Sequence, residues 1–108
     1  MAQNVDDNDG EGESGVVTAK KVKVKRPSLY RVLIHNDDYT TMEFVIYVLQ
    51  KYFHKTSEEA QAIMLKVHRE GVGICGVYTF EVAETKASKV SRDAKENGHP
   101  LKCSVEPE

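Results

Sequence analysis

The stretch His35–Met42, with the sequence HNDDYTTM, separates two segments that have different apolar patterns. The residues before it, 29–34 (LYRVLI), are rich in β-branched and aromatic side chains and predict a strand. After it, apolar residues recur at intervals of three and four positions, which predicts a helix with one apolar face: Met42, Val45, Ile46, Leu49, Tyr52 and Phe53. HNDDYTTM is therefore a strand-to-helix junction, and the remaining elements follow from it.

The junction carries more short polar side chains than a turn requires. Thr40 and Thr41 are both candidates for the N-cap of the helix. Asn36, Asp37 and Asp38 favour such junctions because their side chains bond to nearby backbone, but two adjacent carboxylates repel unless a cation lies beside them. Two interpretations stay open at this point: turn and cap chemistry alone, or one carboxylate and the Asn acting as acceptors for a positively charged ligand.

The rest of the chain alternates helical and extended patterns. Thr56 and Glu59 fit a capping box that begins a second helix, and Gly71 is placed to end it. The remaining segments predict a strand over 72–78, a third helix after Thr79 that stops at the sequence NGHP (97–100), and a strand over 101–106. This order, βααβαβ, predicts an α+β sandwich in which three helices pack on a small antiparallel three-stranded sheet.

Residues 1–26 differ in composition from the rest. Their first half is acidic and rich in glycine, and their second half is basic. Because few apolar residues are available there to offset the entropy of ordering, we expect a disordered N-terminal extension, followed from Pro27 by a folded domain over 27–108. Basic residues without interleaved aromatics favour a solvated linker over a nucleic-acid site.

Composition excludes several classes of protein. A formal net charge of −2 over 108 residues gives no general attraction to nucleic acid or to an anionic membrane. No apolar run approaches the ~20 residues of a membrane span, and the first residues lack the features of a signal peptide. Cys75 and Cys103 lie far apart and are expected to be reduced core residues, so the expected location is the cytoplasm.

The sequence offers little support for an enzyme. Residues 71–76 (GVGICG) match a dinucleotide-binding pattern, but they follow a predicted helix and begin a strand, the reverse of what that site needs. The four histidines lack the spacing of a zinc site, so no metal or other cofactor is expected. Asp38 and His68 could form an acid–base pair, but no nucleophile or phosphate-binding loop accompanies them.

A binding site fits the same residues better. Met42 and Met64 lie at positions that could border the Asn-Asp-Asp junction, and His68 lies at the edge of the second helix's apolar face. These residues predict a small pocket with apolar walls and acceptors at its mouth. An apolar side chain next to an ammonium group has the matching chemistry.

Several motifs, in order, make the chain from Pro27 onwards similar to one known family. Together they resemble ClpS, the adaptor of the Clp AAA+ protease: NDDYT (36–40), MEFV (42–45), ML (64–65), VH (67–68), CGV (75–77), EVAETK (81–86) and HPL (99–101). The family's fold is the βααβαβ sandwich that the periodicity also predicts.

The resemblance implies an adaptor that binds N-degrons. Members of the family bind the free α-amino group of a protein whose first residue is Leu, Phe, Tyr or Trp. They deliver it to the ClpA unfoldase for degradation by ClpP. By position, Asn36, Asp38 and His68 would contact the α-amino group, and Glu81 with Lys86 would dock on the N-terminal domain of ClpA. The expected pocket residues are His35, Thr40, Met42, Val45, Met64, Val67 and Leu101.

The chain departs from the family's pattern at two positions, and other functions stay open. His35 stands beside the pocket where an aliphatic residue is expected, and Thr41 stands where proline is common. These departures suggest a divergent paralogue with a narrower or weaker set of accepted N-terminal residues than a typical member. The main alternative is a regulator that docks on the unfoldase without binding degrons; a small hydrolase and a ribosomal-stalk-like interaction domain are others. Adaptor action needs no oligomer, so a monomer is expected.

Overall fold

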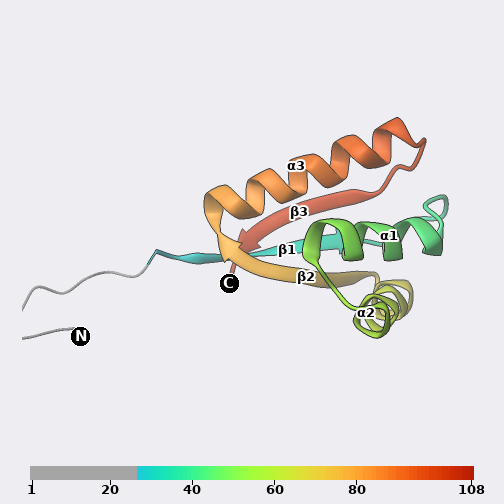
Figure 1. Ribbon diagram of the computed structural model, residues 1–108, viewed down its shortest axis with the longest axis horizontal. Helices are drawn as coiled ribbons and strands as arrows, with labels where there is room; N and C mark the ends of the chain where they lie inside the picture. Colours follow the sequence, from blue (N-terminus) through green and yellow to red (C-terminus); the bar gives the residue numbers. More distant parts are fainter. Residues whose placement is uncertain (1–26) are drawn as a thin grey trace, which may run out of the picture.

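The computed structural model describes residues 27–108, which form a three-stranded sheet with three helices (Figure 1). The elements follow in the predicted order: β1 (Leu29–His35), α1 (Met42–Phe53), α2 (Ser57–Glu70), β2 (Val72–Thr79), α3 (Phe80–Glu96) and β3 (Lys102–Pro107). The predicted α+β class and βααβαβ order are confirmed. The disordered extension predicted for residues 1–26 lies outside the described residues. No helix between residues 27 and 108 combines the length and apolar character needed to cross a membrane.

β1 is the central strand of the sheet. The order is β2-β1-β3, and β1 pairs antiparallel with both neighbours. The register with β2 shifts between Val32 and Leu33, where an irregularity accommodates the fully buried Cys75. On one face of β1, Val32 and Ile34 are fully buried in the core; on the other face, Arg31 and His35 are partly exposed and Leu33 is 9% exposed. This alternation is that of a strand with one face on the core.

The helix boundaries follow the predicted capping chemistry. Thr41 is the N-cap of α1, and its Oγ1 accepts a hydrogen bond from the N–H of Phe44 at 3.1 Å. The predicted capping box between Thr56 and Glu59 is present in full. Gly71 ends α2 with a φ of 90°, a left-handed conformation that glycine adopts without strain. Thr79 occupies the N-cap position of α3 without a side-chain cap bond.

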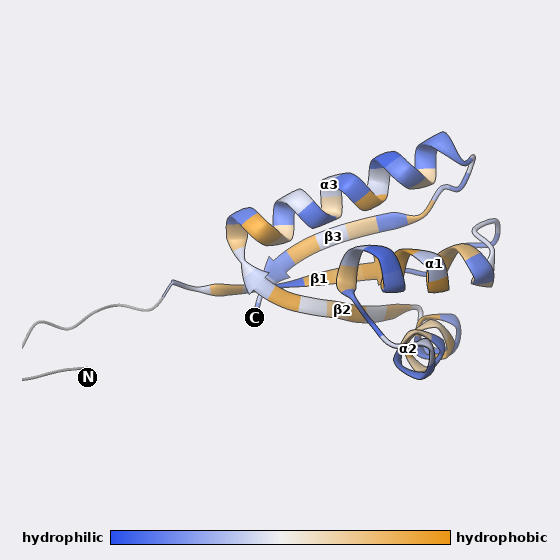
Figure 2. Ribbon diagram, in the orientation of Figure 1, coloured by the Kyte–Doolittle hydropathy of each residue, from blue (hydrophilic) through white to orange (hydrophobic). Residues whose placement is uncertain are grey.

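The buried core contains residues of β1, β2 and the three helices together with Leu101, and the partly buried Cys103 and Val105 of β3 pack against it. In Figure 2, hydrophobic residues follow the strands, whereas α3 is mostly hydrophilic with apolar residues at intervals. The fully buried side chains of largest volume are Ile34, Leu49, Val32, Val48, Val90 and Cys75. Cys75 is buried and Cys103 partly buried, and no disulfide joins them.

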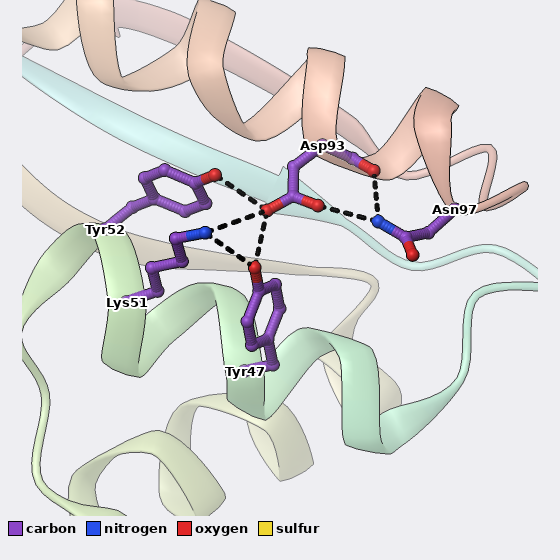
Figure 3. A network of polar contacts seen from close by, with 5 residues as sticks. All are labelled: Tyr47, Lys51, Tyr52, Asp93 and Asn97. Carbon is purple, nitrogen blue, oxygen red and sulfur yellow. Dashed lines mark hydrogen bonds and ion pairs between the residues drawn. The ribbon is translucent and has the colours of Figure 1, made fainter.

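A buried carboxylate joins α1 to α3 (Figure 3). Asp93 of α3 accepts hydrogen bonds from the hydroxyl groups of Tyr47 (2.8 Å) and Tyr52 (2.7 Å), both on α1, and from Asn97 Nδ2 (2.7 Å). Lys51 Nζ lies 3.9 Å from Asp93 and donates to the Tyr47 hydroxyl. The Tyr52 hydrogen bond, with those from Tyr47 and Asn97 and the Lys51 charge, outweighs burial and holds the pKa of Asp93 below its usual value.

We predict that Asp93→Asn lowers the free energy of unfolding at neutral pH by about 1–3 kcal/mol, because it weakens a buried hydrogen-bond network. The folded pKa of Asp93 is depressed, so its stabilisation is present above the unfolded pKa of about 4 and is lost as pH falls through the folded pKa. Urea unfolding at several pH values should therefore show a shallower loss of stability in acid for the variant. Glu84→Gln, an exposed position on the same helix, is the control; equal slopes for Asp93→Asn and the unmodified chain would contradict the prediction.

Candidate functional site

A hollow of about 250 Å³ lies where the junction, α1 and α2 meet. Its lining comes from the polar loop after β1, the first turn of α1 and the second half of α2. Nine residues line it: Asn36, Asp37, Asp38, Thr40, Met42, Val45, Met64, Val67 and His68. Eight of these were predicted site residues, and the fold brings them together from segments up to about thirty positions apart.

Polar and apolar residues occupy different parts of the hollow. Asn36, Asp38 and His68 are exposed, whereas Val45, Met64 and Val67 are buried and belong to the core. Since the apolar residues are held by core packing, their positions are determined before any ligand binds. The hollow therefore has a rigid apolar wall and a solvent-accessible polar mouth.

A backbone hydrogen bond holds the two sides of the mouth together. The N–H of Asn36 donates to the carbonyl oxygen of Gly71 at 2.9 Å, which joins the junction to the end of α2. His68 lies in the last turn of α2, so the same bond positions it relative to Asn36. A Cβ atom at Gly73 would lie 2.6 Å from Val67 Cγ2, so the glycine allows α2 to approach β2 closely.

The two adjacent carboxylates have different environments. Asp37 Oδ1 accepts from the N–H groups of Tyr39 (2.8 Å) and Thr40 (2.7 Å), and Oδ2 accepts from the Thr40 hydroxyl at 2.7 Å. Burial opposes ionisation of Asp37, but the hydrogen bonds from Thr40 and Tyr39 outweigh it, and its pKa is lower than usual. Within residues 27–108, Asp38 has no hydrogen-bonded or ion-paired partner. Asp37 therefore forms the turn and leaves Asp38 available.

The turn and cap interpretation of the junction is confirmed for Asp37 and Thr41, and the ligand-binding interpretation stays a prediction for Asn36 and Asp38. Turn and cap chemistry is supplied by Asp37 and Thr41, while Asn36 and Asp38 stay exposed at the hollow. Asp37 was not among the predicted site residues. The sequence feature that could have predicted its role in the turn is the Asp-x-Tyr-Thr spacing, because a carboxylate can bond to the backbone N–H groups two and three residues later.

His35 was predicted to line the pocket, but it does not. Its side chain lies on the face of the sheet opposite to that of the buried Ile34. Nε2 of His35 is hydrogen-bonded to Ser104 Oγ at 2.7 Å, and the ring lines a separate groove with Arg31 and Leu33. The physical reason is the alternation of side chains along β1, which gives His35 the opposite orientation to the fully buried Ile34. Leu101 is a buried core residue that does not line the hollow.

The two predicted docking residues lie on α3. Glu81 is exposed in the first turn of this helix. Lys86 is partly buried: its Nζ donates to the carbonyl oxygen of Tyr52 at 2.7 Å and lies over the rings of Tyr78 (5.2 Å) and Phe53 (5.8 Å). Lys86 therefore also satisfies a carbonyl near the C-terminal end of α1.

Residues 27–108 include no cluster of three or more His, Cys, Asp or Glu side chains that could hold a metal ion. What they present at the hollow is a set of acceptors beside an apolar wall. This arrangement can bind a group that has hydrogen-bond donors and a positive charge next to an apolar side chain.

Comparison with known proteins identifies the family of the chain. The family model described as "ATP-dependent Clp protease adaptor protein ClpS" matches residues 25–104. The chain belongs to the ClpS family. It is 56% identical over 107 residues to the adapter protein ClpS of Caulobacter vibrioides (strain NA1000 / CB15N), with 98% of each chain covered. It is 54% identical over 107 residues to ClpS 1 of Rhizobium meliloti (strain 1021), covering 96% of this chain and 92% of the relative.

A solved ClpS structure has the same fold. The structure of Agrobacterium tumefaciens ClpS2 bound to L-phenylalaninamide matches with a TM-score of 0.74 and 41% identity, covering 77% of this chain and 100% of that chain. The resemblance to ClpS is confirmed, and the chain is an adaptor of the Clp protease rather than an enzyme. That it is a second, divergent paralogue stays a prediction; its identity to ClpS 1 is higher than that to ClpS2.

The division of roles between the two carboxylates can be tested by amide hydrogen exchange. We predict that Asp37→Ala accelerates exchange at the amides of Tyr39 and Thr40 by about two- to tenfold, the equivalent of hydrogen bonds worth about 0.5–1.5 kcal/mol. The adjacent variant Asp38→Ala is the matched control and should leave both rates nearly unchanged. Equal effects of the two variants, measured by NMR, would show that Asp37 has no special role in the turn.

Proposed function

We propose that this ClpS protein binds the free α-amino group and the first side chain of proteins that begin with Leu, Phe, Tyr or Trp. The observation that carries the proposal is the hollow in which exposed Asn36, Asp38 and His68 adjoin a buried apolar wall. L-phenylalaninamide, bound by the related ClpS2, combines a free α-amino group with an aromatic side chain. The chemistry of that ligand matches the two parts of this hollow.

An α-ammonium group suits the mouth of the hollow. It has three N–H donors and a positive charge, and Asp38 supplies the opposite charge with two acceptor oxygens. Asn36 supplies an amide oxygen, and His68 offers a ring nitrogen to the ammonium or the first peptide group. Acetylation would remove the charge and two of the donors, leaving desolvated acceptors unpaired at a cost of about 1–3 kcal/mol.

The first side chain suits the wall formed by Met42, Val45, Met64 and Val67. Burying a Leu or Phe side chain contributes about 1.5–3 kcal/mol. The hollow, at about 250 Å³, is smaller than the roughly 300–1,000 Å³ of typical small-molecule sites, which suits a single side chain. A side chain branched at Cβ would place bulk at the mouth, where Met42 lies, so Ile and Val should be poor first residues.

Delivery requires a second surface. We propose that Glu81 and Lys86 of α3 dock on the N-terminal domain of a ClpA-type unfoldase, which passes the substrate to ClpP. Neither residue lines the hollow, so degron and unfoldase can be held at once. Residues 1–26 are proposed to engage the unfoldase, and the chain is proposed to act as a monomer.

The binding half of the proposal is tested by fluorescence anisotropy with a short labelled peptide that begins with Phe. We expect saturable binding that acetylation of the peptide weakens at least tenfold, because the ammonium charge is lost. Asp38→Asn should weaken binding of the free peptide by a similar factor, since it removes the opposing charge while keeping the shape. Glu58→Gln, which removes one exposed carboxylate about ten positions from His68 along α2, should leave affinity unchanged.

Equal binding of free and acetylated peptides would overturn the proposed ammonium site. No binding of either, together with retained binding to the unfoldase, would favour the regulator that docks without recognising degrons.

The delivery half is tested with a reporter protein that begins with Phe, degraded by ClpA and ClpP. We predict that Glu81→Arg slows degradation at least severalfold because it reverses a charge on the proposed docking surface. The variant should still bind the peptide in the anisotropy assay. Unchanged degradation would show that docking occurs elsewhere on the chain.

A further inference from the structure

The hollow is bordered by two methionines that differ in their access to solvent. Met42, the first residue of α1, is 47% exposed, whereas Met64 on α2 is 9% exposed. Both line the hollow. Oxidation of a thioether by a dissolved peroxide requires contact with the sulfur, so the rate of oxidation increases with the exposure of the side chain to solvent. Met42 is therefore the methionine of the hollow that a dissolved oxidant reaches first.

The two cysteines compete poorly for the same oxidant. Cys75 is fully buried and Cys103 is partly buried. Burial raises the pKa of Cys103 to about 12 and that of Cys75 further still. Because the thiolate is the form that reacts, both sulfurs are held in an unreactive state at neutral pH. Within residues 27–108, Met42 is thus the sulfur-containing residue with the largest exposed fraction.

We propose that Met42 is a site of reversible oxidation by peroxides, and that its sulfoxide weakens binding of an apolar first residue. The effect on binding rests on the proposed function of the hollow, whereas the oxidation of Met42 does not. In the reaction, the Met42 sulfur gives two electrons to hydrogen peroxide, the O–O bond breaks, and one oxygen bonds to sulfur. The other oxygen leaves as water, so the thioether becomes a sulfoxide and the peroxide is reduced.

The effect on binding follows from polarity. A sulfoxide replaces an apolar, flexible group with one that carries a strong hydrogen-bond acceptor. A bound Leu or Phe side chain would cover that oxygen without offering it a donor, so binding would desolvate it uncompensated. Met42 lies at the mouth of the hollow, outside the core, and its oxidation leaves the fold intact because the new oxygen can stay in water.

The experiment uses the full chain treated with hydrogen peroxide and analysed by peptide mapping with mass spectrometry. We expect Met42 to gain one oxygen well before Met64. In the anisotropy assay with the Phe peptide, the oxidised protein should bind about tenfold more weakly than the untreated sample. Treatment with methionine sulfoxide reductase and a reductant should restore the affinity.

Two variants assign the loss to a residue, each compared with its own untreated sample. Affinity of Met42→Leu should be insensitive to peroxide, whereas Met64→Leu should lose affinity as the unmodified chain does. Equal oxidation of the two methionines, unchanged affinity after Met42 is oxidised, or a peroxide-sensitive Met42→Leu would each overturn the proposal. Absence of peptide binding before any oxidation would instead refute the proposed function, and the peptide map would still test the reactivity of Met42.

Discussion

The hydrogen bond from the Asn36 N–H to the Gly71 carbonyl is the contact on which the hollow depends. It joins the loop that leaves β1 to the end of α2, and so places Asn36 and Asp38 opposite His68. The bond requires a carbonyl freed at the end of a helix, and Gly71 provides it because its left-handed conformation ends α2 at that point. Residues about thirty positions apart therefore form one site through main-chain geometry, before any ligand is present.

The second requirement is a separation of roles between neighbouring carboxylates. If both had to bind a ligand, the turn would have no acceptor for the N–H groups of Tyr39 and Thr40. Asp37 satisfies those donors together with the Thr40 hydroxyl, and its depressed pKa keeps it ionised. This turn keeps Asp38 exposed, with no partner among residues 27–108. A single aspartate in this loop could bond the backbone of the turn or face the hollow, but it could not do both.

Periodicity and capping chemistry predicted the elements because these signals are local: the capping box at Thr56 and the helix stop at Gly71 lie within a few residues of what they control. Most of the site could also be predicted, since motif spacing and the resemblance to ClpS selected eight residues of one hollow. His35 was misplaced because neighbours in sequence point to opposite faces of a strand. The Asp93 network, and the bond from Lys86 to Tyr52, escaped prediction because their partners lie 34 to 46 positions away.

Helix α1 connects the hollow to one of the proposed docking residues. Its first turn carries Met42 and Val45 at the hollow, and the carbonyl of Tyr52 near its other end is bound by Lys86 of α3. A helix of 12 residues is about 18 Å long, so the hollow and the proposed docking residue lie at opposite ends of one rigid element. The Asp93 network also fixes that helix to α3, through Tyr47 near its middle and Tyr52 near its C-terminal end. A substrate chain at the hollow would thus be separated from the proposed docking residue Lys86 by most of the length of α1. This spacing supports the proposal that the adaptor holds both partners at once.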